Sequence, residues 1–211
     1  MNLTEELKKH ADQSAAKIPL EIQNVMKKAI KDLEESGLVA NALKKGDTIP
    51  EITAPNATGK TISVQEKLKT GKVILTFYRG GWCPYCNLEL KALQEILPQI
   101  EEKGATLIAI TPEKPDNSLS TTEKNALTFE VVTDKDNKIA SAFNLTYKLP
   151  KELVDIYLTF GINLEKSNEN ISNELPIAAT YIIDTDGAIV YDFIKEDYKL
   201  RADTAEILAA L

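Results

Sequence analysis

A strand and a helix meet at Tyr78-Arg79-Gly80-Gly81-Trp82-Cys83-Pro84-Tyr85-Cys86, which holds the only two cysteines of the 211-residue chain. The apolar run 73–78 precedes this junction, and apolar residues at helical spacing follow it over 87–97. A C-x-x-C pair beside such a pattern is typical of a dithiol that opens and closes a disulfide. The junction is therefore the predicted reaction centre.

Cys83 is the predicted nucleophile of this pair. A thiolate at a helix N-terminus is stabilised by unpaired backbone N–H groups and by the positive end of the helix dipole. Pro84 suits the first helical position, where a missing N–H costs nothing. Cys86 follows one turn later, at about 5–6 Å between Cβ atoms. We expect Cys83 to be ionised and reachable from solvent, and Cys86 to be the resolving thiol.

The residues around the cysteines are expected to support them. Arg79 adds positive charge, and Trp82 adds an apolar rim. Gly81, with its neighbouring glycine, lets the backbone approach a partner closely. Tyr85 completes the Cys-Pro-Tyr-Cys centre.

A structural disulfide and a metal site are the other roles that two cysteines could have. A disulfide that closes so short a loop restrains little of the unfolded chain. A closed zinc site needs four ligands, and the only histidine, His10, lies far away in a helical segment where we expect it to be solvated. We expect no metal and no cofactor beyond the Cys83–Cys86 dithiol.

Bulk properties exclude several classes of partner. A net charge of −7 argues against nucleic acid and anionic membranes as partners, since both bind to basic patches. The apolar run 73–78 is far shorter than the roughly 20 residues that cross a bilayer. Residues 1–20 lack the apolar core and cleavage site of a secretory signal, so we expect a cytoplasmic protein.

Two parts are predicted along the chain. Residues 1–45 form a helical extension with amphipathic helices over 3–16 and 20–33, divided at Ile18-Pro19. We favour packing of this extension on its own domain over a dimerisation arm, which leaves a homodimer as an alternative. Residues 46–211 form the second part, an α/β domain.

The α/β domain begins with an irregular entry and a small hairpin. Segment 113–125 is predicted to be a loop with a short helix, and 161–174 a polar surface excursion. Strands are predicted over 73–78, 105–110, 127–133, 180–183 and 188–194, and helices from 83, from 138 to 143, over 150–160 and after the N-cap Asp203. This order predicts a mixed sheet flanked by helices.

Three passages carry a family resemblance: Gly46-Asp47-Thr48-Ile49-Pro50-Glu51-Ile52, the segment 77–86, and 179–187. From about Gly46 to Leu211 the chain resembles the alkyl hydroperoxide reductase / thiol-specific antioxidant (AhpC/TSA) superfamily, and within it the peroxiredoxin-like branch. The resemblance implies a thioredoxin-like fold and an antioxidant thiol peroxidase recycled by a thioredoxin-type donor. Carried over, Cys83 takes the peroxidatic place and Cys86 the resolving place.

The chain also departs from its relatives around the centre. Gly80 stands where peroxiredoxins have a threonine, and Ala178 where they have a second arginine. Many thioredoxin-like proteins have a cis-proline at that second place, which only Pro176 could supply here. Phe77 replaces the buried acid of thioredoxins, so Glu89 is a candidate for proton transfer with Cys86, although we expect Glu89 to be solvated.

Three functions stay open on these residues. The first is peroxide reduction through a Cys83 sulfenic acid that Cys86 resolves. The second is thiol–disulfide exchange on disulfide substrates with the same pair. The third is a non-catalytic module for redox sensing or binding.

Overall fold

The computed structural model describes residues 2–211 and is built on a five-stranded sheet in the order β5-β4-β3-β8-β9. These strands are β3 (Val73–Phe77), β4 (Thr106–Thr111), β5 (Glu130–Thr133), β8 (Ala179–Ile183) and β9 (Ile189–Ile194). Strands β3, β4 and β5 are parallel, β8 pairs antiparallel with β3, and β9 pairs antiparallel with β8 at the edge of the sheet. Every residue of the central strand β3 is buried, which its apolar composition requires.

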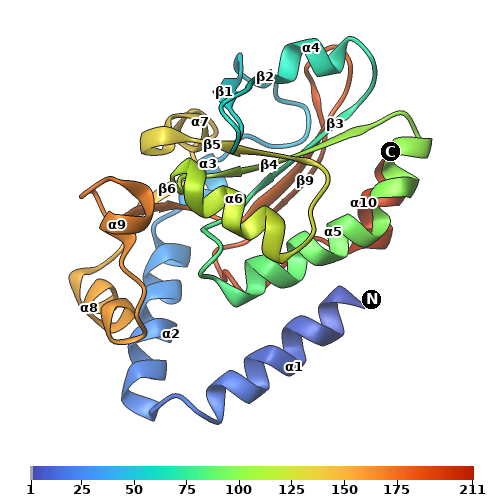
Figure 1. The fold of residues 1–211 in the computed structure, drawn as a ribbon. Coiled ribbons are helices and arrows are strands. Elements are labelled where there is room, and N and C mark those ends of the chain that lie inside the picture. Colours follow the sequence, from blue (N-terminus) through green and yellow to red (C-terminus); the bar gives the residue numbers. More distant parts are fainter. Residues whose placement is uncertain (1) are drawn as a thin grey trace.

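Helices and a small hairpin cover the two faces of this sheet (Figure 1). Helices α5 (Pro84–Glu102) and α10 (Thr204–Ala210) lie on one face. The hairpin of β1 (Thr53–Pro55) and β2 (Thr61–Ser63) covers the other face together with α4 (Val64–Leu68) and α7 (Lys138–Ala142). Helix α6 (Pro115–Lys124) contacts β5. This is the central mixed sheet flanked by helices that the sequence predicts.

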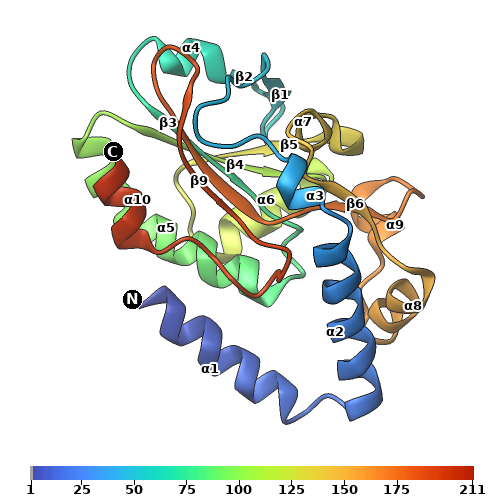
Figure 2. The ribbon, with the colours of Figure 1, turned by 180° about the vertical axis from the view of Figure 1, so that it is seen from behind.

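The N-terminal helices wrap around this body (Figure 2). They are α1 (Leu3–Ala15), α2 (Leu20–Glu35) and the short α3 (Leu38–Asn41). Leu3 and Leu7 bury the apolar face of α1 against α5, and α2 contacts α8 (Lys151–Thr159). The extension thus packs on its own chain, as expected, while the domain boundary at residues 45/46 stays a prediction.

Several short elements differ from the sequence-based expectation. Segment 113–125 is mostly the helix α6, and 161–174 contains α9 (Leu164–Asn168). β6 (Thr146–Lys148) pairs with β7 (Glu174–Pro176) across a long separation in the chain, and η1 (Lys135–Asn137) precedes α7. Elements of three to five residues are too short for apolar periodicity to reveal. No peptide bond within residues 2–211 is cis, so Pro176 is trans.

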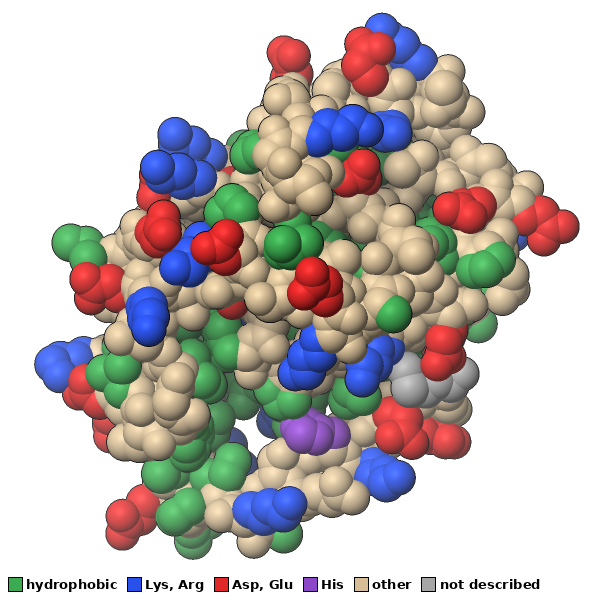
Figure 3. All heavy atoms as spheres, in the orientation of Figure 1, with side chains coloured by type: hydrophobic (Ala, Val, Ile, Leu, Met, Phe, Trp, Pro, Cys, Tyr) green, Lys and Arg blue, Asp and Glu red, His purple; other side chains and the backbone are tan. Residues whose placement is uncertain are grey.

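The surface carries mixed charge. Figure 3 shows basic and acidic side chains interspersed over one face, with hydrophobic side chains gathered where α2 and α8 lie side by side. No helix within residues 2–211 combines the length and the apolar character that a bilayer span requires.

Candidate active site

Cys83 lies where the loop after β3 enters helix α5. It is the N-cap residue with extended backbone angles, and Pro84 occupies the first turn. The carbonyl of Cys83 accepts hydrogen bonds from the Asn87 N–H at 3.1 Å and from Asn87 Nδ2 at 3.0 Å. The structure therefore confirms the predicted arrangement, in which Pro84 occupies the first turn of the helix and the Cys83 side chain lies at the helix N-terminus.

Cys86 lies in the first turn of α5 beside Cys83, and both thiols are free. A hydrogen bond from Cys86 and the positive charges of Arg79 and Arg201 outweigh burial, and lower the pKa of Cys83 to about 6. Burial and the neighbouring Cys83 raise the pKa of Cys86 well above its ordinary value. One thiol is thus prepared to ionise near neutral pH while the other keeps its proton.

The expectation of an accessible sulfur is wrong for this structure. Cys83 is only 1% exposed, and Cys86 is fully buried. Both belong to a core cluster that includes Tyr85, with Trp82 and Tyr198 packed against it. The sequence pattern at the helix start could not reveal this enclosure, because Tyr198 comes from the distant segment after β9.

Arg79 is buried beside Cys83 in an aromatic cage. Its guanidinium carbon lies 4.4 Å from the ring centre of Tyr198, 5.0 Å from that of Trp82 and 5.6 Å from that of Tyr157. Arg79 also donates to the Tyr157 hydroxyl. Cation–π contacts hold this charge in place, and within residues 2–211 no carboxylate forms a salt bridge with it. The positive charge of Arg79 is one of the causes that lower the pKa of Cys83, so it favours the thiolate form of this cysteine.

A second buried cation, Arg201, lies beside Cys86. Its Nη2 donates to the Cys86 sulfur at 3.2 Å, and its Nε donates to Glu89. Thr76 Oγ1 donates to the same carboxylate at 3.3 Å. Burial raises the pKa of Glu89 to about 7 although Arg201 opposes the shift.

The expectation that Glu89 lies on a solvated helix surface is wrong, because its exposed fraction is 2%. Burial is tolerable because the loop before α10 brings Arg201 onto the carboxylate. Glu89 follows Cys86 by three residues on α5, a spacing that places both on one helix face. This spacing indicates from the sequence that Glu89 can lie near Cys86, whereas no periodic pattern indicates Arg201.

Glu113 holds the loop that precedes Cys83. Its Oε2 accepts a hydrogen bond from the Gly81 N–H at 2.7 Å. A Cβ at Gly81 would come within 2.0 Å of Thr121 Oγ1, so α6 leaves room only for glycine. Burial raises the pKa of Glu113 to about 7, against the lowering effect of the Gly81 N–H. No sequence pattern indicates a role for this acid, which lies in the segment predicted to be a loop with a short helix.

Tyr85 points from α5 toward the N-terminal helix. Its ring meets that of His10 edge-on at 4.9 Å and that of Tyr198 at 5.6 Å. His10 is half-buried and within 3.3 Å of Ser14 Oγ, so the prediction of a merely solvated histidine is wrong. Within residues 2–211, no three His, Cys, Asp or Glu side chains gather as a metal site requires.

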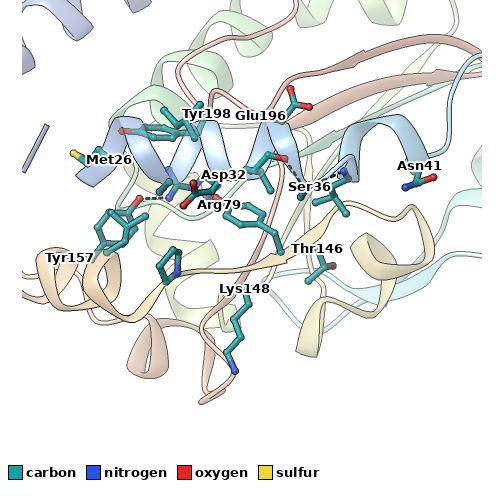
Figure 4. Close-up of a pocket in the computed structure, with 17 residues that line it drawn as sticks. Met26, Asp32, Ser36, Asn41, Arg79, Thr146, Lys148, Tyr157, Glu196 and Tyr198 are labelled. Atoms are coloured by element: carbon teal, nitrogen blue, oxygen red, sulfur yellow. Dashed lines mark hydrogen bonds between the residues drawn. The ribbon is translucent and has the colours of Figure 1, made fainter. Parts of the chain in front are cut away.

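A cavity of about 390 Å³ opens next to this site, between α2, β6, α8 and the segment after β9 (Figure 4). Arg79, Tyr157 and Tyr198 are among its lining residues. Tyr147, Tyr198 and Arg79 each interact electrostatically with Cys83. The cavity thus ends on the groups that surround the buried sulfur.

Known proteins share this fold and sequence pattern. Residues 45–192 match the model of the AhpC/TSA family. "Peroxiredoxin Bcp" of Escherichia coli (strain K12) is 23% identical over 159 residues, which cover 75% of this chain and 89% of that protein. "Thiol-disulfide oxidoreductase ResA" of Bacillus thuringiensis (strain Al Hakam) is 26% identical over 155 residues, or 73% of this chain and 72% of that protein.

Solved structures agree with the fold. The crystal structure of "Peroxidoxin BcpB" from Mycobacterium tuberculosis superposes with a TM-score of 0.63 at 19% identity, covering 80% of this chain and 96% of that one. The comparisons confirm the thioredoxin-like fold and the family that the sequence predicts, and the relatives named peroxiredoxin support the thiol-peroxidase class. The chain belongs to the AhpC/TSA family.

Proposed function

We propose that Cys83 is the peroxidatic cysteine of this thiol peroxidase and that Cys86 is its resolving cysteine. The observation that carries this assignment is the placement of the two sulfurs, with Cys83 as the N-cap residue of α5 and Cys86 in the first turn, where Arg201 Nη2 donates to it at 3.2 Å. The lowered pKa of Cys83 and the raised pKa of Cys86 agree with this placement. A thiolate is the nucleophile of such reactions, which suits Cys83. Cys86, which keeps its proton, reacts only after Cys83 has been oxidised.

The first step oxidises Cys83. Its thiolate attacks the terminal oxygen of the hydroperoxide, the O–O bond breaks, and the sulfenic acid of Cys83 forms. The two electrons of the new S–O bond come from the sulfur, and the terminal oxygen keeps its hydrogen. The leaving oxygen takes up a proton from solvent, which replaces the one that Cys83 released on ionising, and departs as an alcohol or as water. The guanidinium of Arg79, within the aromatic cage, faces the charge that moves in this step.

The second step closes the disulfide. Cys86 attacks the sulfenic sulfur, the S–O bond breaks, and the hydroxyl leaves with the Cys86 proton as water. Arg201, which donates to the Cys86 sulfur at 3.2 Å, stabilises the negative charge that develops there. Glu89, with its pKa raised to about 7, can hold a proton next to this pair. Arg201 and Glu89 are positioning residues in this scheme.

A thioredoxin-type dithiol completes the cycle. Its thiolate attacks the Cys83–Cys86 disulfide, its second thiol displaces the mixed disulfide, and two electrons return to this protein. The family supports a peroxide substrate and such a reductant. As further parts of the proposal, the protein works in the cytoplasm, where such donors keep thiols reduced, and a homodimer remains an alternative to the monomer.

The second candidate is thiol–disulfide exchange on a disulfide substrate. The compact C-x-x-C turn, with Cys86 hydrogen-bonded to Cys83, favours it. The relative named a thiol-disulfide oxidoreductase supports the same alternative. Cys83 would then attack the substrate disulfide, and Cys86 would release the reduced product.

One coupled assay separates the two candidates. Thioredoxin, thioredoxin reductase and NADPH are supplied with either cumene hydroperoxide or a small disulfide, and NADPH oxidation is followed. We expect faster turnover with the hydroperoxide, and loss of turnover in Cys83→Ser. If the protein turned over only the disulfide, its function would be thiol–disulfide exchange. Full turnover by Cys83→Ser with either substrate would contradict both candidate functions.

A further inference from the structure

The cavity beside the active site is bounded on one side by the N-terminal extension. Met26, Ala29 and Leu33 of α2 line it, together with Leu153 and Tyr157 of α8. Figure 4 shows Met26 and Tyr157 on these two helices. Helix α2 ends at Glu35, before the matched family region begins at residue 45. This wall of the cavity is therefore a feature of this chain's extension.

The size of the cavity exceeds what hydrogen peroxide needs. Pockets that hold small organic ligands measure about 300–1,000 Å³, and this one measures about 390 Å³. A water molecule takes up roughly 30 Å³ in the liquid, and hydrogen peroxide has only one more oxygen. Most of the cavity would thus stay unused by hydrogen peroxide.

The polarity of the cavity selects among larger ligands. Its inner end holds Arg79, whose buried Nε has no hydrogen-bond partner. Asp32, Lys148 and Glu196 also line the cavity, so its two acidic and two basic side chains leave it without net charge, which favours a neutral ligand over an ion. The arrangement fits a neutral molecule with an apolar body and one polar end that accepts a hydrogen bond. An organic hydroperoxide with an uncharged hydrocarbon group has this form.

We infer that helix α2 is the specificity wall of the active site, and that Met26, Ala29 and Leu33 make the protein prefer hydroperoxides with a bulky neutral hydrocarbon group over hydrogen peroxide. The inference rests on the proposed function. The hydrocarbon group lies against α2 and α8, and the hydroperoxide end points past Arg79 toward Cys83. Contact with the hydrocarbon group stabilises the bound substrate because it removes apolar surface from water.

The test fills the cavity from α2. Ala29→Phe adds a ring to the wall without adding a second tryptophan to a chain that has one. The matched control is Lys27→Phe, at an exposed position of the same helix that does not line the cavity. The measured quantity is kcat/KM for cumene hydroperoxide divided by kcat/KM for hydrogen peroxide.

We expect Ala29→Phe to lower this ratio at least about tenfold, in the range that a change in pocket size produces. Lys27→Phe leaves the ratio at the wild-type value. Leu33→Ala, which enlarges the cavity, raises the ratio for a hydroperoxide bulkier than cumene hydroperoxide. An unchanged ratio in both Ala29→Phe and Leu33→Ala would overturn the inference, even if one of them also lowered overall activity.

A binding measurement checks the same wall without catalysis. Cumyl alcohol, the product of cumene hydroperoxide reduction, is titrated into Cys83→Ser protein while Trp82 fluorescence is followed, since Trp82 lies 5.0 Å from the Arg79 guanidinium carbon. Binding that Ala29→Phe weakens and Lys27→Phe preserves supports the wall; equal binding in all three proteins contradicts it. A wild-type protein that consumes no peroxide would instead contradict the proposed function.

Discussion

Replacement of Glu113 by glutamine should change how stability depends on pH. Glu113 is 2% exposed, and its carboxylate accepts a hydrogen bond from the Gly81 N–H at 2.7 Å. Burial raises its pKa from 4.5 to about 7. Since one pKa unit corresponds to about 1.4 kcal/mol, ionisation of this group in the folded protein costs about 3 kcal/mol of folding free energy.

The sign follows from proton binding. Between pH 4.5 and about 7 the folded protein holds the Glu113 proton that the unfolded chain releases. The free energy of unfolding therefore falls as pH rises through this window. Glu113→Gln is neutral throughout, and its amide oxygen can still accept from the Gly81 N–H. Relative to wild type, the variant should gain most of the roughly 3 kcal/mol between about pH 5 and pH 8.

Urea unfolding of the reduced protein, followed by Trp82 fluorescence, measures this difference. Free energies of unfolding are compared for wild type and variant at several values between about pH 5 and pH 8. Glu123→Gln, at an exposed position of helix α6, which follows Glu113, is the matched control and should show no such trend. A constant difference between Glu113→Gln and wild type across this range would refute the reasoning.

Two further changes address the charges around the sulfurs. Arg201→Met leaves the Glu89 carboxyl buried without its cation and should lower the free energy of unfolding by roughly 3–5 kcal/mol in urea titrations at neutral pH. Addition of Glu89→Gln to this variant should restore part of the loss. Purely additive effects of the two substitutions would contradict the coupling between these residues. Arg79→Met should raise the pKa of Cys83 above its value of about 6, because one of the positive charges that lower it is removed; thiolate absorbance followed against pH measures this, and an unchanged titration would contradict it.

Local patterns predicted the elements on which the site is built. The apolar run before Tyr78 became β3, and the Cys83-Pro84 start became the N-terminus of α5. Asp203 caps α10 as expected, with its side chain accepting from the Ala205 N–H at 2.7 Å. Each of these features depends on neighbours within one or two turns, which is the range over which sequence patterns carry information.

The surroundings of the sulfurs depend on contacts between distant segments. Arg201 reaches Cys86 across 115 positions of the chain, and Tyr157 reaches Arg79 across 78. The place of Glu89 on a helix does not show its burial, which depends on its pairing with Arg201. A buried charge pair leaves no periodic pattern in the sequence, so the sequence pointed to Glu89 and Arg79 but not to Arg201 or Tyr157.

The most direct test of the account is a single turnover of Cys86→Ser protein, in which the resolving thiol is absent. The reduced variant is mixed with an equimolar amount of cumene hydroperoxide, quenched with dimedone and analysed by intact and peptide mass spectrometry. The account predicts one sulfenic acid per chain, trapped on Cys83, together with release of cumyl alcohol. An unmodified Cys83 after exposure to excess hydroperoxide, in a variant shown to be folded, would contradict it.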